Sequence, residues 1–532
     1  MEREVAWKKY DEAQLAEMGA LAADYIDFIS DNKTERECAA ASIELAEKAG
    51  YRSLDEAVRQ GRALVPGDKV WACDHGKAVI LVQLGRAPLA EGANILGAHI
   101  DSPRLDLKQN PLYESNGFAF LDTHYYGGIK HYQWVTLPLA LHGVIAKKDG
   151  TVVEVRLGED PGDPVFCVTD LLPHLGNQQM GKKASEVVEG EALDVLVGNR
   201  PARSCGSASA EDSATRRSAA QDPSDPSCAS LLQSDEYKNG VQTVAPSSAD
   251  AEPLGDVAGD GAAPSADVSD DSGRGEEKEP VKAHILSLLA DAYGIDEEDF
   301  LSAEIEVVPA GRARDCGFDR SMVIGYGQDD RVCAYTSLVA QLALADEVPE
   351  RTAMTVLVDK EEIGSVGATG MASQFFENTV AEVMALAGEE GALPLRRGLK
   401  ACRMLSSDVS AGFDPAYASV FETKNSAFLG RGLVFNKYTG ARGKSGSNDA
   451  SAEYVARVRR VMDDANVSFQ TAELGRVDAG GGGTIAYIPA KYGMDVIDSG
   501  VAVLSMHAPW EVTSKADIYE ACRGYEAFLR NA

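Results

Sequence analysis

The sequence has little positive charge for its length. Its 532 residues include 51 lysines and arginines but 83 aspartates and glutamates, which gives a formal net charge of -32 at pH 7. Nucleic acids and anionic membranes are bound through basic surfaces, so this balance argues against both as partners. The apolar content is ordinary at 44%, and a chain of this length can bury a large core in two or more domains.

Paired cysteines and long apolar runs are also missing. The nine cysteines are an odd number and form no CxxC motif, which favours reduced thiols in the cytoplasm over a disulfide framework or a structural zinc site. The first residues, MEREVAWKKYDEAQLAEMG, lack the apolar centre of a secretory signal. No run reaches the ~18 apolar residues that a transmembrane helix needs. We therefore expect a cytoplasmic protein without a membrane partner.

Residues 201–280 are poor in the side chains that build a core. Tyr237 is their only aromatic residue, and sixteen acidic residues stand against six basic ones. Such a segment cannot bury enough apolar surface to offset the entropy lost on ordering, so we predict that it is disordered. It is either an interaction tether or an inert expansion of a surface loop, and the second alternative is favoured.

The N-terminal part of the chain has helical and then strand-like patterns. Residues 10–48 predict two helices, and Thr34 with Glu37 forms a capping box at the start of the second. Residues 69–100 contain apolar runs that predict strands. A helical layer followed by a buried sheet is typical of an α/β domain.

The remainder divides into two kinds of pattern. Residues 112–198 are rich in short strands and turns, whereas helices and strands alternate after residue 281. We therefore predict an α/β catalytic domain of residues 1–108 and 315–532, with a central mixed sheet flanked by helices. A β-rich domain, residues 109–314, is inserted into it and carries the acidic segment.

The stretch VLVDKEEIGSVGATG, residues 356–370, carries the clearest chemical signal. An apolar run ends at Val358, two adjacent carboxylates follow at Glu361 and Glu362, and three glycines come next. A buried strand that ends in paired acids and a flexible loop is one way to build a metal-dependent hydrolytic site. On its own, such a pair is more often a solvated strand end.

Four further polar residues follow predicted strands: His99, Asp329, Asp408 and His507. The carboxyl ends of strands in an open α/β sheet lie along one edge, where ligands bind. Two histidines and several carboxylates, with no cysteine, suit zinc, manganese or cobalt in a catalytic site with an open position. Each residue alone has a structural alternative, such as a helix cap at Asp329. Their joint occurrence favours the metal site.

These residues lie in motifs of a known family. The segments GAHIDSPRLDLK, GYGQDDRVCAYTSL, VDKEEIGSVGATG, LSSDVSAGFDP and SMHAPWEV, in this order, closely resemble the M18 family of metalloaminopeptidases. The best-known members are aspartyl aminopeptidases, and GGIKHYQW and VPAGRARDCGFDRSM resemble the bacterial branch. The resemblance covers nearly the whole chain except residues 200–280, which we expect to be an insertion peculiar to this protein.

The resemblance implies a zinc-peptidase fold and a dinuclear zinc centre, with manganese or cobalt as substitutes. Asp329 would bridge the two ions, and each ion would take one more histidine and one more carboxylate: His99 with Asp408, and His507 with Glu362. Glu361 would act as the general base. Asp101 would accept the ring N–H of His99 that the metal does not use, which fixes the tautomer.

Other residues match the family less specifically. Lys437, Tyr438 and Lys444 lie in a region that lines the substrate pocket in the family, and basic groups there suit an acidic N-terminal side chain. A solvated glycine-rich loop is an equal alternative. His174, in LLPHL, resembles a segment whose histidine reaches a neighbouring subunit's active site, although a structural histidine is as good a reading.

The resemblance also implies assembly and activity. Family members form dimers through the inserted domain and then tetrahedral dodecamers that admit only peptides. The function expected is removal of the N-terminal residue, including Asp or Glu, from peptides. Two alternatives stay open: another dinuclear amide hydrolase, such as an N-deacylase, and a non-catalytic scaffold related to the enzyme.

Overall fold

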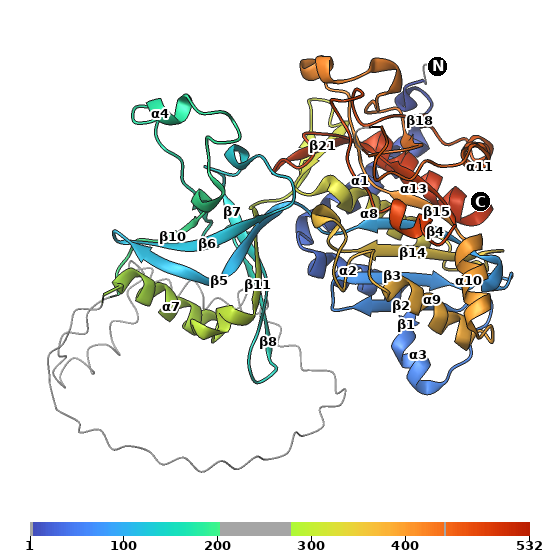
Figure 1. The fold of residues 1–532 in the computed structure, drawn as a ribbon, viewed down its shortest axis with the longest axis horizontal. Coiled ribbons are helices and arrows are strands. Elements are labelled where there is room, and N and C mark those ends of the chain that lie inside the picture. The colour runs from blue at the N-terminus through green and yellow to red at the C-terminus, as the bar shows by residue number, and fades with distance from the viewer. Residues whose placement is uncertain (1–3, 203–277, 441–442) are drawn as a thin grey trace, which may run out of the picture.

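The computed structural model describes residues 4–202, 278–440 and 443–532, which form a large α/β part and a separate β-rich part (Figure 1). The disorder predicted for residues 201–280 lies almost wholly outside the described residues. Within these residues, no helix is both long and apolar enough to cross a bilayer. The seven cysteines in the described ranges are free thiols, as the scattered spacing predicts.

A nine-stranded mixed sheet forms the centre of the α/β part. From edge to edge its strands are β1 (Arg52–Ser53), β2 (Lys69–Asp74), β3 (Ala78–Gln83), β14 (Thr352–Val358), β4 (Ala93–His99), β15 (Arg403–Ser407), β19 (Asp495–Gly500), β17 (Leu433–Asn436) and β18 (Phe469–Thr471). The four strands β14, β4, β15 and β19 are mutually parallel. Their carboxyl ends therefore meet at one edge of the sheet.

Helices cover both faces of this sheet. One face packs against α1 (Glu12–Asp31), α2 (Glu35–Lys48), α8 (Gln328–Leu342), α11 (Ala452–Asp464) and α13 (Lys515–Asn531). The other packs against α3 (Leu54–Gln60), α9 (Phe375–Leu386), α10 (Ala392–Ala401) and α12 (Tyr487–Ala490). Strands β3, β4 and β14 are buried at every position, which explains why their sequences are continuous rather than alternating apolar runs.

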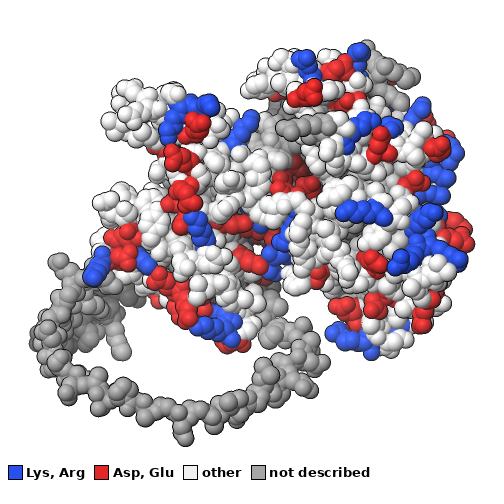
Figure 2. All heavy atoms as spheres, viewed as in Figure 1, with Lys and Arg blue, Asp and Glu red and all other residues white. Residues whose placement is uncertain are grey.

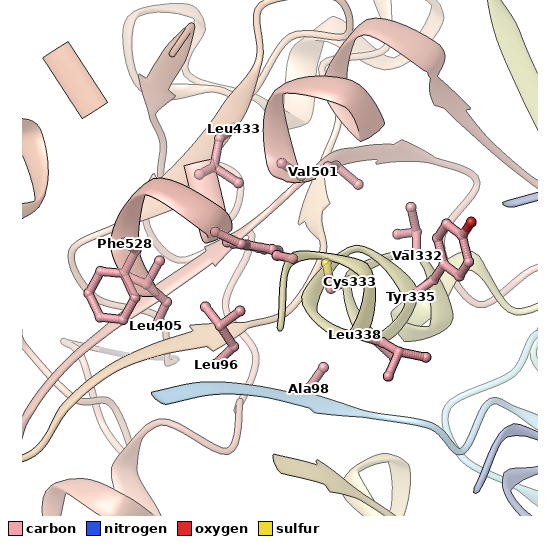
Figure 3. Packing of buried hydrophobic residues seen from close by; sticks show 14 of the residues in the cluster. Leu96, Ala98, Val332, Cys333, Tyr335, Leu338, Leu405, Leu433, Val501 and Phe528 are labelled. Atoms are coloured by element: carbon pink, nitrogen blue, oxygen red, sulfur yellow. The ribbon is translucent and has the colours of Figure 1, made fainter. Parts of the chain in front are cut away.

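The core between β4 and the helices fixes where the site can form. Leu96 and Ala98 of β4 lie beneath Leu338 of α8, and Phe528 of α13 packs beside them (Figure 3). All four side chains are fully buried. Close packing on both faces holds the end of β4, and therefore His99, in one position.

A second sheet forms the β-rich part. Its strands, in spatial order, are β8 (Val152–Leu157), β7 (Leu139–Ala146), β11 (Ala303–Pro309), β5 (Arg104–Ser115), β6 (Phe118–Tyr126), β10 (Val195–Gly198) and β9 (Cys167–Val168). Helix α7 (Pro280–Tyr293) packs on this sheet, and the short helix α4 (Asn177–Met180) lies on an arm that points away from the α/β part (Figure 1). The predicted fold class, an α/β domain with an inserted β-rich domain, is confirmed. We call the two parts the catalytic domain and the inserted domain.

A third, small sheet has five short strands from distant parts of the chain. Its strands are β12 (Arg314–Cys316), β13 (Met322–Gly325), β21 (Glu511–Ser514), β20 (Ala502–Leu504) and β16 (Ser410–Ala411). It brings the start of α8 next to the last strands of the chain. The sequence patterns did not separate these strands from the main sheet.

The N-terminal helices agree with the sequence pattern. The Thr34 side chain accepts a hydrogen bond from the Glu37 backbone, and the Glu37 side chain accepts one from the Thr34 backbone. The predicted capping box is therefore confirmed. It places Lys33 in the tight connection between α1 and α2, where its side chain points into the junction of the two domains.

Buried charges connect the inserted domain to α1 and α2. Lys33 Nζ lies 2.5 Å from Glu159 Oε1 and donates to the Pro309 carbonyl. His142 of β7 contacts Glu37 at 2.8 Å and Glu159 at 3.1 Å. Burial alone would raise the pKa of Glu159, but His142 and Lys33 lower it to about 2. The Glu159 carboxylate is therefore charged at neutral pH, and its contacts with Lys33 and His142 join the inserted domain to the connection between α1 and α2.

Removing Lys33 should destabilise the protein strongly. Lys33→Ala leaves Glu159 buried with one partner fewer, and breaking a buried pair in this way costs about 3–5 kcal/mol. The matched control is Lys48→Ala, which breaks an exposed pair with Glu44 on α2 and should cost about 0.3–0.5 kcal/mol. Urea-induced unfolding measures both. Equal effects of the two substitutions would show that the buried network does not stabilise the junction.

Candidate metal centre

Three neighbouring parallel strands bring four of the predicted site residues together. Strand β4 ends at His99, and β15 ends one residue before Asp408. Strand β14 ends at Val358, and Glu361 and Glu362 follow in a single 3-10 turn, η7 (Glu361–Ile363). The order β14-β4-β15 in the sheet places the paired glutamates on one side of His99 and Asp408 on the other.

Asp329 and His507 come from a different sheet, so the expectation that all five strand ends share one edge is wrong. Asp329 lies at the start of α8, after β13, and its peptide bond to Asp330 is cis. His507 lies in the tight connection between β20 and β21. The small sheet pairs β13 with β21. This pairing brings Asp329 and His507 together beside the ends of the main-sheet strands.

Asp329 lies between the two histidines. Its Oδ1 is 3.2 Å from His99 Nε2, and its Oδ2 is 3.2 Å from His507 Nε2. Burial alone would raise the pKa of Asp329, but the contacts with His507 and His99 lower it below its usual value. Burial lowers the pKa of His507, yet Asp329 raises it to about 10. Asp329 thus directs one carboxylate oxygen toward each of the two histidines.

Two groups of three side chains could each hold a metal ion. Potential ligand atoms lie within 4.8 Å of one another in His99, Asp329 and Asp408, and likewise in Asp329, Glu362 and His507. Asp329 belongs to both groups. The first group is deeply buried, with His99 1% exposed, whereas the side chain of His507 is 35% exposed. In the second group, His507 is therefore the side chain that reaches solvent, because those of Asp329 and Glu362 are only 5% and 3% exposed.

The site holds more negative charge than its histidines can balance. Burial, followed by the charge of Asp329, raises the pKa of Glu362 well above its usual value. Burial, Asp330 and Glu361 do the same to the pKa of Asp408. Glu362 Oε1 is buried without a hydrogen-bond partner. Buried carboxylates without enough cationic partners are stabilised when they bind a metal ion. Carboxylate oxygens and imidazole nitrogens are ligands that zinc accepts. Acidic side chains also gather near the junction of the domains in Figure 2.

Asp101 organises the residues around it. Its Oδ1 lies 3.2 Å from His99 Nδ1 and accepts a hydrogen bond from the Glu361 backbone, while Oδ2 accepts from the Glu362 backbone. The Tyr126 hydroxyl also donates to Oδ2, at 2.8 Å. One buried carboxylate therefore holds the ring of His99 and the turn that carries both glutamates.

Glu511 is a site residue that the sequence reasoning missed. Its Oε2 accepts a hydrogen bond from the Asp329 backbone at 3.0 Å, and its Oε1 accepts one from the His507 backbone at 2.7 Å. Burial raises its pKa to about 8. The position of Glu511, four residues after His507 in SMHAPWEV, is the only sequence signal that could have found it.

The predicted substrate-binding residues have other contacts in the structure. Lys437 and Lys444 both pair with Asp449, and the Tyr438 hydroxyl donates to Glu473. Tyr438 and Lys444 line a cavity of about 210 Å³. His174 is exposed on the arm that carries α4. In the described ranges, no hydrogen bond or ion pair links these four residues to the metal-binding groups.

Fold and site together define a metal-dependent hydrolase: a mixed α/β sheet whose strand ends gather carboxylates and histidines around a shared aspartate. The family model that describes aminopeptidase I zinc metalloproteases (M18) matches residues 28–221 and 247–529. The chain belongs to the M18 family of zinc aminopeptidases, hydrolases that act on peptide bonds.

Individual relatives match along the whole chain. A probable M18 family aminopeptidase 1 of Clostridium acetobutylicum is 53% identical over 526 residues, which cover 99% of this chain and 98% of the relative. The crystal structure of aminopeptidase I from that organism has a TM-score of 0.81 at 52% identity, and that of an M18 aminopeptidase from Thermotoga maritima 0.82 at 37%. Each of the two alignments covers 100% of this chain and 100% of the solved structure's chain. Relatives of nearly equal length show that residues 200–280 are not peculiar to this protein, which corrects that expectation.

Glu511→Gln should weaken zinc binding. The glutamine amide has only one acceptor oxygen, so its NH2 group would point at the backbone N–H of Asp329 or His507. That residue must then shift. Losing a contact that orients a metal ligand lowers metal affinity by about 10–100-fold. Asp517→Asn is the matched control, because Asp517 is also buried and accepts two backbone N–H groups, from Gly430 and Gly432. Zinc titration of the metal-free proteins measures the effect. The same zinc affinity in both variants would exclude a role for Glu511 at the centre.

Proposed function

We propose that this protein is a dinuclear zinc aminopeptidase in which Asp329 bridges the two ions. The observation that carries the proposal is the position of Asp329, with one oxygen 3.2 Å from each of two histidine nitrogens. His99 and Asp408 would complete one subsite, and His507 and Glu362 the other. Manganese or cobalt would substitute at ligands of this type.

Glu361 is the residue best placed to act as the general base. It lies in the same turn as Glu362 but belongs to neither group of potential ligands. Its Oε2 lies 4.0 Å from His99 Nε2, and its side chain is 17% exposed, against 3% for Glu362. A carboxylate at the border of the cluster can take a proton from water and deliver it to the leaving amine. Zinc, when bound, would polarise the scissile carbonyl and make water a nucleophile at neutral pH.

The other residues of the site position these groups. Asp101 holds the backbone of Glu361 and the ring of His99, and Glu511 holds the backbones of Asp329 and His507. The open side of the centre, at His507, is where a peptide can enter. Its free α-amino group would bind near an ion or an acid there, which restricts cleavage to the N-terminal residue.

Glu361→Gln should separate catalysis from metal binding. We expect turnover to fall by about 10²–10⁴-fold because the base is lost, while the zinc content stays at the wild-type value. The matched variants Glu362→Ala and His507→Ala should lose zinc instead. Elemental analysis of the dialysed proteins, together with peptide hydrolysis, measures both properties. Loss of zinc in Glu361→Gln would make Glu361 a ligand.

The residues expected to recognise Asp or Glu are Lys437 and Lys444. The two ammonium groups share the single carboxylate of Asp449, which leaves one positive charge in excess. Lys444 also lies over the ring of Tyr438, 3.6 Å from its centroid, at the edge of the cavity. The cavity is also lined by Arg476, Glu473 and Asp478, so its lining charges balance. The preference for an acidic side chain therefore rests on the family resemblance and needs its own test.

Chromogenic aminoacyl substrates will test the side-chain preference. We expect Asp and Glu substrates to be cleaved best, and Lys444→Ala to lower kcat/KM for them by about tenfold, the worth of one charge-assisted hydrogen bond. Lys491→Ala, at a lysine over the Tyr487 ring, is the matched control. A preference for Leu or Lys would refute acidic recognition, and cleavage of N-acetylated peptides would point to a deacylase or an endopeptidase instead.

We also propose that the chain assembles with copies of itself in the cytoplasm, through the inserted domain. Leu171, Leu172, Leu175 and Met180 are exposed on the arm that carries α4. Exposed apolar groups of this kind favour association. A mature yeast aminopeptidase of similar fold, at 18% identity and a TM-score of 0.67, is described as a dodecamer. A dimer of this chain, built further into a tetrahedral dodecamer, is the assembly to test.

A further inference from the structure

Three consecutive residues of the inserted domain each face a different residue of the metal centre. The Tyr126 hydroxyl donates to Asp101 Oδ2 at 2.8 Å. Gly127 lies against Glu362, because a Cβ placed there would be 3.1 Å from Glu362 Oε2. The Gly128 carbonyl accepts a hydrogen bond from His507 Nδ1 at 2.9 Å. This segment, the end of β6 and the two residues after it, therefore contacts two residues of the second group of potential ligands directly and reaches His99 of the first group through Asp101.

The ring of Tyr126 packs against an arginine that both domains bind. The Arg104 guanidinium lies over the ring, 3.9 Å from its centroid. Arg104 is paired with Glu306 at 3.0 Å, in the inserted domain, and lies 3.6 Å from Glu35 of α2, in the catalytic domain. All three of these charged side chains are buried. The hydroxyl that reaches Asp101 is thus fixed by both domains rather than by a flexible loop.

Gly127 leaves little space for any other residue. Its φ of +77° is a left-handed conformation, and an added Cβ would also lie 3.3 Å from Pro103 Cβ and 3.4 Å from Glu362 Cβ. Contacts this short require a neighbour to move. The backbone of Glu362 is tied to Asp101, so the Glu362 side chain is the group that must give way.

Gly128 acts on the other imidazole. A hydrogen bond from Nδ1 to a backbone carbonyl fixes the tautomer of His507 and leaves Nε2 free to face Asp329. His507 Nε2 does lie 3.2 Å from Asp329 Oδ2. On the opposite side, His99 Nδ1 is hydrogen-bonded to the Asp101 backbone carbonyl at 3.0 Å and lies 3.2 Å from Asp101 Oδ1. The Tyr126 hydroxyl donates to Oδ2 of the same carboxylate.

We propose that Tyr126, Gly127 and Gly128 form a positioning element through which the inserted domain fixes both metal subsites at once. Tyr126 acts through Asp101 on His99 and on the turn that carries Glu361, Gly127 provides the space that Glu362 occupies, and Gly128 orients His507. The inference rests on the proposed dinuclear function. It assigns the inserted domain a part in building the active site, separate from any part in assembly.

The first test compares two neighbouring tyrosines. Tyr126→Phe keeps the ring under Arg104 but removes the hydroxyl, and Tyr125→Phe removes a hydroxyl from an adjacent ring that is 39% exposed. We expect Tyr126→Phe to weaken zinc binding and to lower kcat by about tenfold each, with KM within about twofold of wild type. Tyr125→Phe should match wild type in all three measurements. Identical zinc affinity and kcat in the two variants would overturn the role of Tyr126.

The second test compares two glycines of equal backbone strain. Gly127 and Gly117 have φ values of +77° and +78°, but a Cβ at Gly117 would meet nothing within 4 Å. Both Gly→Ala substitutions should lower the thermal unfolding temperature of the zinc-free protein similarly. Only Gly127→Ala should lose one of two zinc equivalents after dialysis against buffered zinc. Equal zinc contents in the two alanine variants would overturn the role of Gly127.

Zinc content of the wild-type protein separates this inference from the function on which it rests. Fewer than two equivalents in wild type would refute the dinuclear function, and the positioning element would fall with it. Two equivalents in wild type and in every variant, together with wild-type zinc affinity and kcat in Tyr126→Phe, would leave the dinuclear function intact and refute the positioning element alone. Two in wild type, with losses confined to Tyr126→Phe and Gly127→Ala, is the result that we expect.

Discussion

The structure depends on a concentration of buried negative charge at the ends of three adjacent strands. Asp101, Asp329, Asp330 and Asp408 are nearly or wholly inaccessible to solvent, and the paired glutamates of η7 lie beside them. Carboxylates in such a place are stable only when they are protonated, paired or bound to cations. Two histidines pair with one of them, Asp329, from opposite sides. The remaining charge makes this edge of the sheet a place for metal ions.

Much of the catalytic domain could be predicted from the sequence, because its signals are local. Strands β4 and β14 are continuous apolar runs that stop at polar residues. Such runs are typical of strands that are buried on both faces of a sheet. The potential ligands lie where those runs stop. What failed was the assignment of strands to sheets, since the short strands β13 and β20 have no pattern that separates them from the main sheet.

The residues that position the ligands could not have been predicted in this way. Glu511 contacts the backbone of Asp329 across 182 positions of sequence, and a single glutamate at the start of a strand does not indicate that partner. Tyr126 is one of two adjacent tyrosines, and only the fold shows which one faces Asp101. Lys437 and Lys444 pair with Asp449, a partner that the glycine-rich pattern around them did not indicate.

The chain leaves the catalytic domain after His99 and returns to it shortly before Asp329, so the inserted domain separates two consecutive ligands. Its inner edge, from Tyr126 to Gly128, forms part of the wall of the centre, while its arm points outward. A protein engineer who excised this domain as a module would therefore remove part of the catalytic apparatus. The inner edge and the catalytic sheet must therefore be treated as one unit.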